Sequence, residues 1–221
     1  MRIRITFAKQ GALRYTGNLD LHRLWERAAR RAELPLAYSQ GFHPQPKMNI
    51  AAALPLGFSS RCEIIDMRLE HEVPLDGLCE KLQGTLPTGI QVSNVESVDE
   101  HSPALQTQVA SAEYEVHLTE AVDGLDLKRR IDSVMEAESI IRERRGKTYD
   151  LRPLIEELTL TPTPLPLGDR KASRRDGPGV RVFMRLTARE GATGRPEEVL
   201  DMLGIAFEGT RIERTRIIFK A

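Results

Sequence analysis

Four arginines lie on one candidate helix near the start of the chain. The run 19–32 carries apolar residues at a spacing of three and four, which predicts a helix with one buried face. Positions 23, 27 and 30 share the opposite face at helical spacing. Guanidinium groups suit bidentate contacts with phosphate or carboxylate. The pattern predicts an anion-binding surface or, alternatively, a solvated face that pairs with acidic residues elsewhere. The arginines are Arg23, Arg27, Arg30 and Arg31.

A proline-rich stretch, Gly-Phe-His-Pro-Gln-Pro-Lys at 41–47, follows this helix. Its two prolines fix φ and remove backbone donors, so the segment cannot form a helix or a central strand. We expect a stiff loop that presents polar and aromatic side chains beside the arginines. The candidate binding residues here are Tyr38, Gln40, Phe42, His43 and Lys47.

A second basic region lies in the strand candidate 180–187, where apolar and polar residues alternate. Val182, Met184 and Leu186 are expected to point inward. An aromatic side chain between arginines on an uncovered sheet face is typical of platforms for single-stranded RNA. The alternative is an edge strand that charge keeps soluble. The candidate binding residues are Arg181, Phe183 and Arg185.

The segment 169–179 is basic and nearly free of bulky side chains. We expect it to be mobile and either to order on an anionic partner or to remain a solvated loop.

Signs of catalysis are few. The sequence has no phosphate-binding Walker loop, no nucleophile elbow and no dinucleotide fingerprint. His22 and His43 have the chemistry of a general acid and base, but nothing in the sequence fixes their geometry. Two scattered cysteines, Cys62 and Cys79, cannot supply an iron–sulfur cluster by themselves. We therefore assign no catalytic residue, no metal site and no cofactor.

Composition indicates an ordinary globular protein. Of the 221 residues, 40% are hydrophobic and 29% are charged. No apolar run reaches the roughly 18 residues of a membrane span, and the N-terminus lacks a signal-peptide core, so we expect a cytoplasmic protein. The net charge of zero hides segregation: residues 1–47 carry 9 Lys or Arg against 3 Asp or Glu, and residues 48–127 carry 3 against 14. Such segregation can create local fields.

Hydrophobic periodicity predicts the same order of elements twice. In the first half we expect strands at 2–7, 50–56, 63–70 and 90–98, with helices at 19–32 and 75–86. In the second half we expect strands at 113–119, 139–145, 180–187 and 212–219, helices at 125–136, 151–158 and 196–203, and an extended stretch at 161–166.

This order predicts an α+β fold of two tandem ferredoxin-like (βαββαβ) halves with antiparallel sheets. The predicted N-terminal domain spans 1–98 and holds the arginine helix and the proline-rich loop. Residues 99–110 are expected to be a linker, because they are polar and carry little bulk. The C-terminal domain is expected at 111–221 and includes the basic loop.

The span 13–63 resembles the radical-SAM-linked protein family of bacteria, whose motifs recur here in order. The matching stretches are Asn-Leu-Asp-Leu at 18–21, Arg23, Arg27-Ala28, Arg30-Arg31-Ala32, Leu-Pro-Leu-Ala-Tyr-Ser-Gln-Gly-Phe at 34–42, Pro44, Pro46-Lys47, Leu-Pro-Leu-Gly at 54–57, Ser60 and Glu63. Weaker matches at 147–153 and 194–196 extend the resemblance over most of the chain.

Members of that family occur beside, or fused to, a cobalamin-binding radical S-adenosylmethionine (SAM) protein. The resemblance therefore implies an accessory role to such an enzyme. The family usually has histidine where this chain has Asn18, so a general base at this position is not expected. His43 stands where asparagine is also common in the family, which argues against an essential catalytic role.

Three functions follow from these observations. The first is a non-catalytic accessory protein that binds RNA or another anionic substrate for a radical SAM enzyme. The second is a metal-independent RNA-processing enzyme of tandem ferredoxin-like fold, with His22 or His43 as the base. The third is a protein-interaction module that docks the radical SAM partner.

Overall fold

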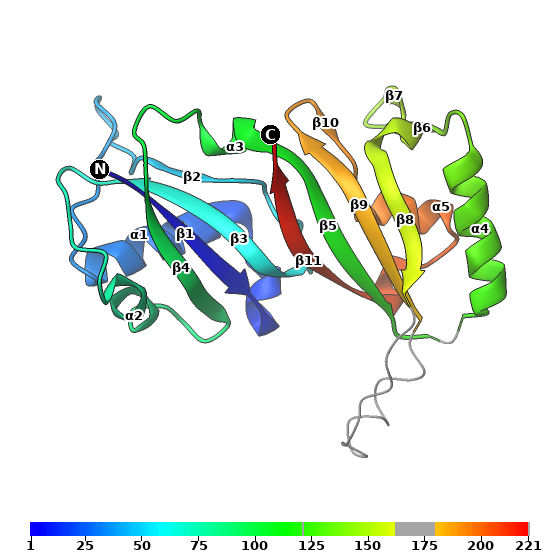
Figure 1. The fold of residues 1–221 in the computed structure, drawn as a ribbon, viewed down its shortest axis with the longest axis horizontal. Helices are drawn as coiled ribbons and strands as arrows, with labels where there is room; N and C mark the ends of the chain where they lie inside the picture. The colour runs from blue at the N-terminus through cyan, green and yellow to red at the C-terminus, as the bar shows by residue number, and fades with distance from the viewer. Residues whose placement is uncertain (121, 162–179, 221) are drawn as a thin grey trace, which may run out of the picture. The chain divides into compact units, whose positions relative to one another are not determined.

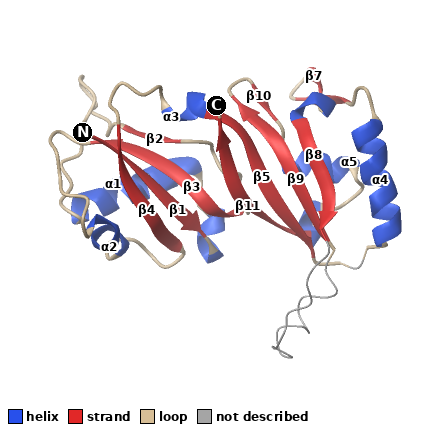
Figure 2. Cartoon of the chain, in the orientation of Figure 1, coloured by secondary structure: helices blue, strands red, loops and turns tan. Residues whose placement is uncertain are grey.

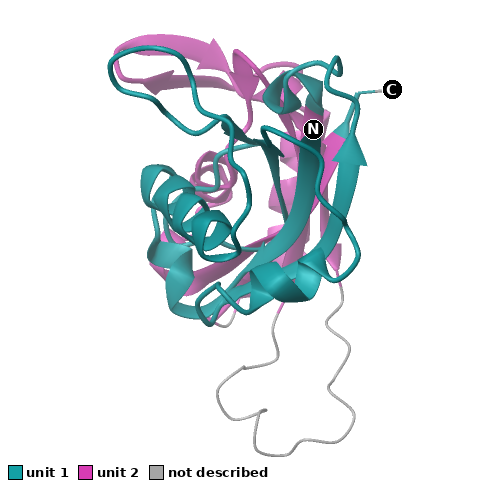
Figure 3. Cartoon of the chain, turned by 90° about the vertical axis from the view of Figure 1, so that its left-hand side faces the viewer, with its two compact units in different colours: residues 1–109, 219–221 teal, residues 110–218 magenta. Residues whose placement is uncertain are grey.

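The computed structural model describes residues 1–120, 122–161 and 180–220 (Figures 1 and 2). The basic segment 169–179, and all but the first residue of the extended stretch 161–166, lie outside these ranges. The chain divides into two compact units (Figure 3). Unit 1 comprises Met1–Val109 with Phe219–Ala221, and unit 2 comprises Ala110–Ile218.

Unit 1 has the element order strand, helix, strand, strand, helix, strand. Its sheet runs in the order β4-β1-β3-β2, and every neighbouring pair is antiparallel. A 3-10 turn η1 (Gly11–Tyr15) and a short helix α3 (Leu105–Gln108) complete it. The principal elements are β1 (Arg2–Lys9), α1 (Asn18–Arg31), β2 (Met48–Ile50), β3 (Ser59–Arg68), α2 (Leu78–Gln83) and β4 (Ile90–Val98).

The helices α1 and α2 cover the same face of the sheet of unit 1. Alternation along β1 buries Ile3, Ile5 and Phe7 completely. The Phe7 ring packs edge-on against Trp25 of α1, with centroids 4.7 Å apart. Leu82 of α2 belongs to the same buried cluster. The apolar side of α1 thus packs in the core, and its arginine-bearing side is exposed to solvent.

The opposite face of β1 is polar and internally neutralised. Arg2 donates to Asp66 on β3 at 2.6 Å and to the carbonyl of Ser102 at 2.7 Å. Arg4 also donates to Asp66, at 2.8 Å, and this hydrogen bond raises the pKa of Arg4. These two cations already have an anionic partner within the protein, so we do not assign them to a binding site.

In unit 2 the main strands run in the order β8-β9-β5-β11, and the short strand β10 also pairs with β9. The hairpin of β6 and β7 forms a separate two-stranded sheet. Two 3-10 turns, η2 (Arg152–Leu154) and η4 (Phe207–Gly209), precede β8 and β11. The remaining elements are β5 (Val109–Leu118), α4 (Gly124–Glu136), β6 (Ile141–Arg144), β7 (Lys147–Asp150), β8 (Ile155–Thr161), β9 (Arg181–Arg189), β10 (Ala192–Thr193), α5 (Pro196–Met202) and β11 (Thr210–Phe219).

The fold is thus mixed α and β with mostly antiparallel sheet, which confirms the predicted class at this level. None of the helices in the described ranges is long and apolar enough to cross a membrane.

The prediction of a helix at 151–158 is wrong. The structure has η2 there, followed by strand β8. The register of β8 against β9 shifts between Ile155 and Glu157, which marks a β-bulge. The bulge lets Ile155 and Leu158, three residues apart, both be buried. A spacing of three is a helical signal in sequence, and the bulge reproduces it within a strand.

Other predicted elements have different bounds or partners. The strand expected at 139–145 is β6, which pairs with β7 and not with the main sheet. The prediction of a strand at 50–56 is wrong, because β2 ends at Ile50 and no strand follows until Ser59. Pro55 lies in this stretch and has no backbone N–H to donate to a sheet. The helix α2 covers only the middle of the helix expected at 75–86. The expected linker 99–110 contains α3, because Leu105 is fully buried and anchors it.

Candidate anion-binding groove

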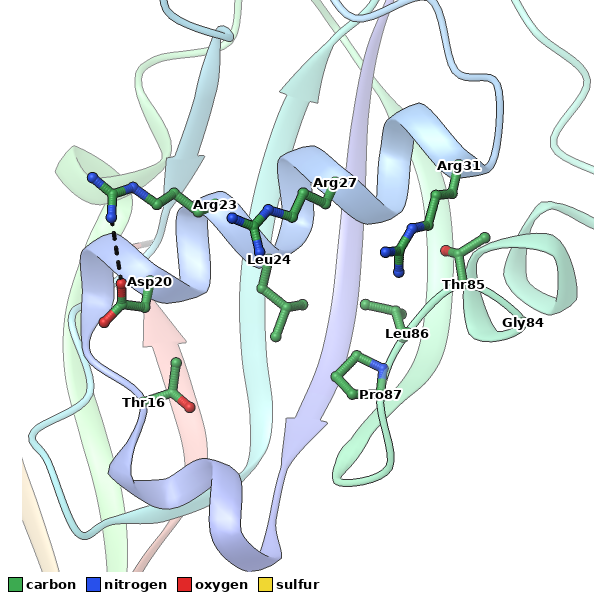
Figure 4. A pocket seen from close by; sticks show the side chains of 10 residues that line it. All are labelled: Thr16, Asp20, Arg23, Leu24, Arg27, Arg31, Gly84, Thr85, Leu86 and Pro87. Atoms are coloured by element: carbon green, nitrogen blue, oxygen red, sulfur yellow. Dashed lines mark ion pairs between the residues drawn. The ribbon is translucent and has the colours of Figure 1, made fainter.

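A groove runs along α1 in unit 1 (Figure 4). One wall is the helix, and the other is the segment 84–87 that connects α2 to β4. Its volume is about 620 Å³. The lining residues are Thr16, Asp20, Arg23, Leu24, Arg27, Arg31, Gly84, Thr85, Leu86 and Pro87.

The arginines of the groove stand one helical turn apart. Arg23, Arg27 and Arg31 follow an i, i+4, i+8 spacing, which places them in a row on α1 (Figure 4). The guanidinium of Arg31 points toward Thr85 and Leu86 across the groove. Like charges at this spacing repel one another, so the row costs helix stability unless an anion compensates it.

Little internal charge neutralises this row. Arg23 lies 3.7 Å from Asp20, and their side chains are 71% and 68% exposed. An ion pair so exposed and so long contributes little. For Arg27 and Arg31, no carboxylate of the described chain lies within ion-pair distance. Two guanidinium groups are therefore available to a ligand.

The facing wall is mostly apolar and is fixed to the helix. Leu86 and Pro87 supply its apolar surface, and Leu24 of α1 faces them across the groove. The hydroxyl of Thr85 is a donor placed 2.8 Å from the carbonyl oxygen of Leu82 and 3.2 Å from the carbonyl oxygen of Ala28. The contact with Ala28 ties the α2–β4 connection to α1. The groove thus has a cationic side and an apolar side, and the hydrogen bond to the backbone of α1 fixes the distance between them.

Arg30 takes no part in the groove, although its spacing from Arg23 and Arg27 predicted a shared site. Each residue advances about 100° around a helix, so Arg31 lies about 80° from Arg23 toward the groove and Arg30 about 20° the other way. Arg30 instead pairs with Glu26 at 2.8 Å and donates to the hydroxyl of Tyr38 at 2.9 Å. The bond to Tyr38 raises the pKa of Arg30.

The proline-rich segment forms neither a helix nor a central strand, and a bridge and a hydrogen bond close its two ends. Tyr38 bridges Pro46, and the backbone N–H of Ser39 donates to the carbonyl of Gln45 at 2.8 Å. The side chain of Phe42 at the tip is 103% exposed. Gln40, His43 and Lys47 are exposed too, and within the described chain no residue of this loop lines the groove. The loop and the groove are therefore separate features.

The basic strand of unit 2 is paired with acidic neighbours. Val182, Met184 and Leu186 of β9 are fully buried, as alternation predicted, and Arg181, Phe183 and Arg185 are half-buried on the other face. Arg185 contacts Glu113 of β5 at 2.8 Å and Glu157 of β8 at 3.1 Å. Arg181 lies 3.8 Å from Glu115. Glutamates on both neighbouring strands thus offset the charge that suggested an RNA platform.

The two candidate general bases are in unlike surroundings. His22 is half-buried on α1, and this burial lowers its pKa. His43 is exposed in the loop. Neither histidine lines the groove within the described chain. In the same ranges, no group of three or more His, Cys, Asp or Glu could hold a metal ion.

Sequence reasoning missed the second wall of the groove. Thr85, Leu86 and Pro87 lie more than fifty positions beyond the arginines and carry no motif of their own. The available signal was topological. In a strand-helix-strand-strand-helix-strand unit with both helices on one face, the end of the second helix lies beside the first.

Comparisons with known proteins give a family and a structural likeness. A family described as an uncharacterized protein conserved in bacteria (DUF2344) matches residues 2–196. None of the curated proteins matches the chain. Among solved structures, the crystal structure of a Cbf5-Nop10-Gar1 complex contains a similar chain, with a TM-score of 0.49 and 12% identity. The likeness covers 97% of this chain and 48% of that one, so the present chain spans about half its length.

Proposed function

We propose, from the premise that this chain belongs to the bacterial DUF2344 family, that it is a non-catalytic protein that binds RNA or another anionic substrate. Binding occurs in the groove between α1 and the segment 84–87. The observation that carries the proposal is the pair of guanidinium groups, Arg27 and Arg31, that line the groove without a carboxylate partner in the described chain.

The sheet face of unit 2 contributes less in this proposal. Its arginines are held by glutamates on two neighbouring strands. An incoming phosphate would have to compete with these contacts, whereas in the groove Arg27 and Arg31 have no carboxylate within ion-pair distance in the described chain. We therefore assign substrate binding to unit 1 and give Arg181 and Arg185 a structural role.

We further infer that the chain acts beside a cobalamin-binding radical SAM enzyme, as the motif resemblance of residues 13–63 implies. Three of the four arginines of that motif, Arg23, Arg27 and Arg31, line the groove, which supports a link between binding and the partnership. The exposed tip of the proline-rich loop favours a docking role as well. Phe42 is a fully exposed aromatic side chain on a turn closed by backbone hydrogen bonds, and we assign it to contact with the enzyme.

The finer fold assignment belongs to the same proposal. We interpret both units as ferredoxin-like halves, the second with the β6–β7 hairpin inserted after its first helix. The element order of each unit supports this, as do the corresponding strand orders β4-β1-β3-β2 and β11-β5-β9-β8.

A binding measurement tests the proposed function. The full chain is titrated into a fluorescent single-stranded RNA at rising salt concentrations. We expect affinity to fall linearly with salt on logarithmic axes, because bound phosphates release counterions. The variant R27A/R31A should bind at least about tenfold more weakly, with a salt slope smaller by about two.

Arg129→Ala, on the first helix of unit 2, is the matched control and should behave as the wild type. Salt-independent binding, or a double variant that binds RNA as tightly as the wild type, would remove the groove from this role.

A further inference from the structure

We propose that the groove of unit 1 holds one phosphorylated nucleoside, with its phosphate on Arg27 and Arg31 and its ring system against Leu24, Leu86 and Pro87. This inference rests on the proposed function and narrows its substrate to a single nucleotide unit. The unit is either a free nucleotide or the end of an RNA strand.

The cationic side of the groove fits a phosphate group. Arg27 and Arg31 are one turn apart on the same side of α1, so their head groups can converge on one anion. A phosphate has enough acceptor oxygens for both planar guanidinium groups, each in a bidentate contact. Asp20 stands at the Arg23 end of the row and disfavours an anion there. The phosphate is therefore placed at the Arg27–Arg31 end.

The apolar side of the groove fits a ring. Leu86 and Pro87 face Leu24 across the groove (Figure 4). Inorganic phosphate would leave this surface exposed to water, whereas a nucleoside would cover it. The volume of about 620 Å³ is within the usual range of small-molecule sites. A groove of this size can hold one nucleotide, and an RNA chain would enter it by an unpaired end, where a base is free to leave the stack.

Unit 2 provides an internal comparison, because it has a groove at the corresponding place. That groove has a volume of about 460 Å³ and runs along its first helix, α4. Counted from the first residue of each helix, Arg129 and Ser133 of α4, and Ala137 directly after its end, stand where α1 has Arg23, Arg27 and Arg31. The residues that line the second groove are Arg129, Arg130, Ser133, Val134, Ala137, Ile140 and Met202.

The second groove lacks the two features on which the proposal depends. Ser133 and Ala137 replace the two free guanidinium groups. Its remaining cations have internal partners: Arg129 lies 3.5 Å from Asp126, while Arg130 pairs with Asp126 and donates to the carbonyl of Leu203 at 2.9 Å. The same architecture thus occurs once with two arginines that lack a carboxylate partner in the described chain and once with serine and alanine in their places. We expect one nucleotide site per chain.

Calorimetric titration of the full chain with adenosine 5′-monophosphate and uridine 5′-monophosphate tests this inference. We expect one equivalent to bind. Adenosine and inorganic phosphate should each bind at least about tenfold more weakly, since each lacks half of the contacts. R27A and R31A should each weaken the nucleotide at least about tenfold, and Arg129→Ala should leave its affinity unchanged.

Competition identifies the source of the nucleotide. A short RNA with a 5′-phosphate should be displaced by adenosine 5′-monophosphate, and the tighter of the two ligands marks the physiological one. Either ranking supports the nucleotide site. Two equivalents per chain, or an equal loss in Arg129→Ala, would overturn it. If no nucleotide binds while RNA binding still depends on Arg27 and Arg31, this inference fails and the proposed function stands.

Discussion

Single positions on α1 decide which arginines can bind a ligand. Arg30 and Arg31 are adjacent in sequence, yet one is held by Glu26 and Tyr38 and the other lines the groove. We therefore expect Arg31→Ala to weaken RNA binding by about tenfold and Arg30→Ala to change it less than about twofold. Fluorescence anisotropy with one RNA at one salt concentration makes the comparison. Equal losses in the two variants would mean that net charge, and not the groove, drives binding.

A second residue-scale prediction concerns Glu197 on α5. Burial raises the pKa of its carboxyl group, and its Oε2 atom has no hydrogen-bond partner among the described residues. A raised pKa means that the folded state holds the proton more tightly. The free energy of unfolding therefore falls as the pH rises above the ordinary value of 4.5.

Glu197→Gln should accordingly raise Tm at pH 7, with no gain near pH 4, where the native carboxyl is protonated in both states. Differential scanning calorimetry at the two pH values measures this, and the exposed Glu208 gives a control, E208Q. A Tm at pH 7 that is unchanged or lower in Glu197→Gln would show that the carboxylate is stabilised in a way the structure does not explain.

At the scale of elements, the position of β4 relative to η1 depends on a glycine. Gly89 has φ of +103°, and an added Cβ would lie 2.7 Å from the carbonyl oxygen of Gln10. The N–H of Gln10 donates to the carbonyl of Gly89 at 2.7 Å, so neither backbone can retreat without losing this bond. We expect Gly89→Ala to lower the free energy of unfolding by about 1–3 kcal/mol.

Urea unfolding of the full chain checks this value. Gly84, in the groove wall, is the matched control, because its φ is −64° and an added Cβ would meet its nearest neighbours only at 3.6 Å. Gly84→Ala should be nearly neutral. A Gly89→Ala variant as stable as the wild type would show that the turn adjusts at no cost.

The elements also show what sequence patterns can predict. Strands with regular alternation, such as β1 and β9, were predicted within two residues, because period two is a direct sign of one buried face. The strand β8 was missed because its bulge changes that period. The arginine row was visible in the sequence, but the division between Arg30 and Arg31 was not. It depends on Tyr38, which chain topology brings to the helix.

At the scale of the whole molecule, the wall of the groove and its second copy could not be read from the sequence. Thr85, Leu86 and Pro87 become part of a site only when α2 packs on the same face as α1. The repeated order of elements was evident in the sequence. That Ser133 and Ala137 occupy the positions of Arg27 and Arg31 becomes visible only when α4 is aligned with α1. The proposed site therefore depends on long-range packing more than on local sequence pattern.

For the whole molecule, we predict a protein partner that contacts the exposed loop tip. Tagged full-length protein, expressed in the bacterium from which it comes, should capture a cobalamin-binding radical SAM enzyme. Phe42→Ala should reduce this capture, because the exposed ring is assigned to the contact, without weakening RNA binding in the separate groove. Mass spectrometry of the eluates measures both proteins. Capture of the enzyme by Phe42→Ala at the wild-type level would exclude the loop tip from the interface.

The most direct measurement of the central claim observes the guanidinium groups themselves. Nuclear magnetic resonance can follow the arginine Nε–H signals of the full chain during titration with single-stranded RNA. We predict that the signals of Arg27 and Arg31 shift first and saturate together, while those of Arg30, Arg129 and Arg185 do not shift. Early shifts of Arg181 and Arg185 with Arg27 and Arg31 unmoved would contradict it.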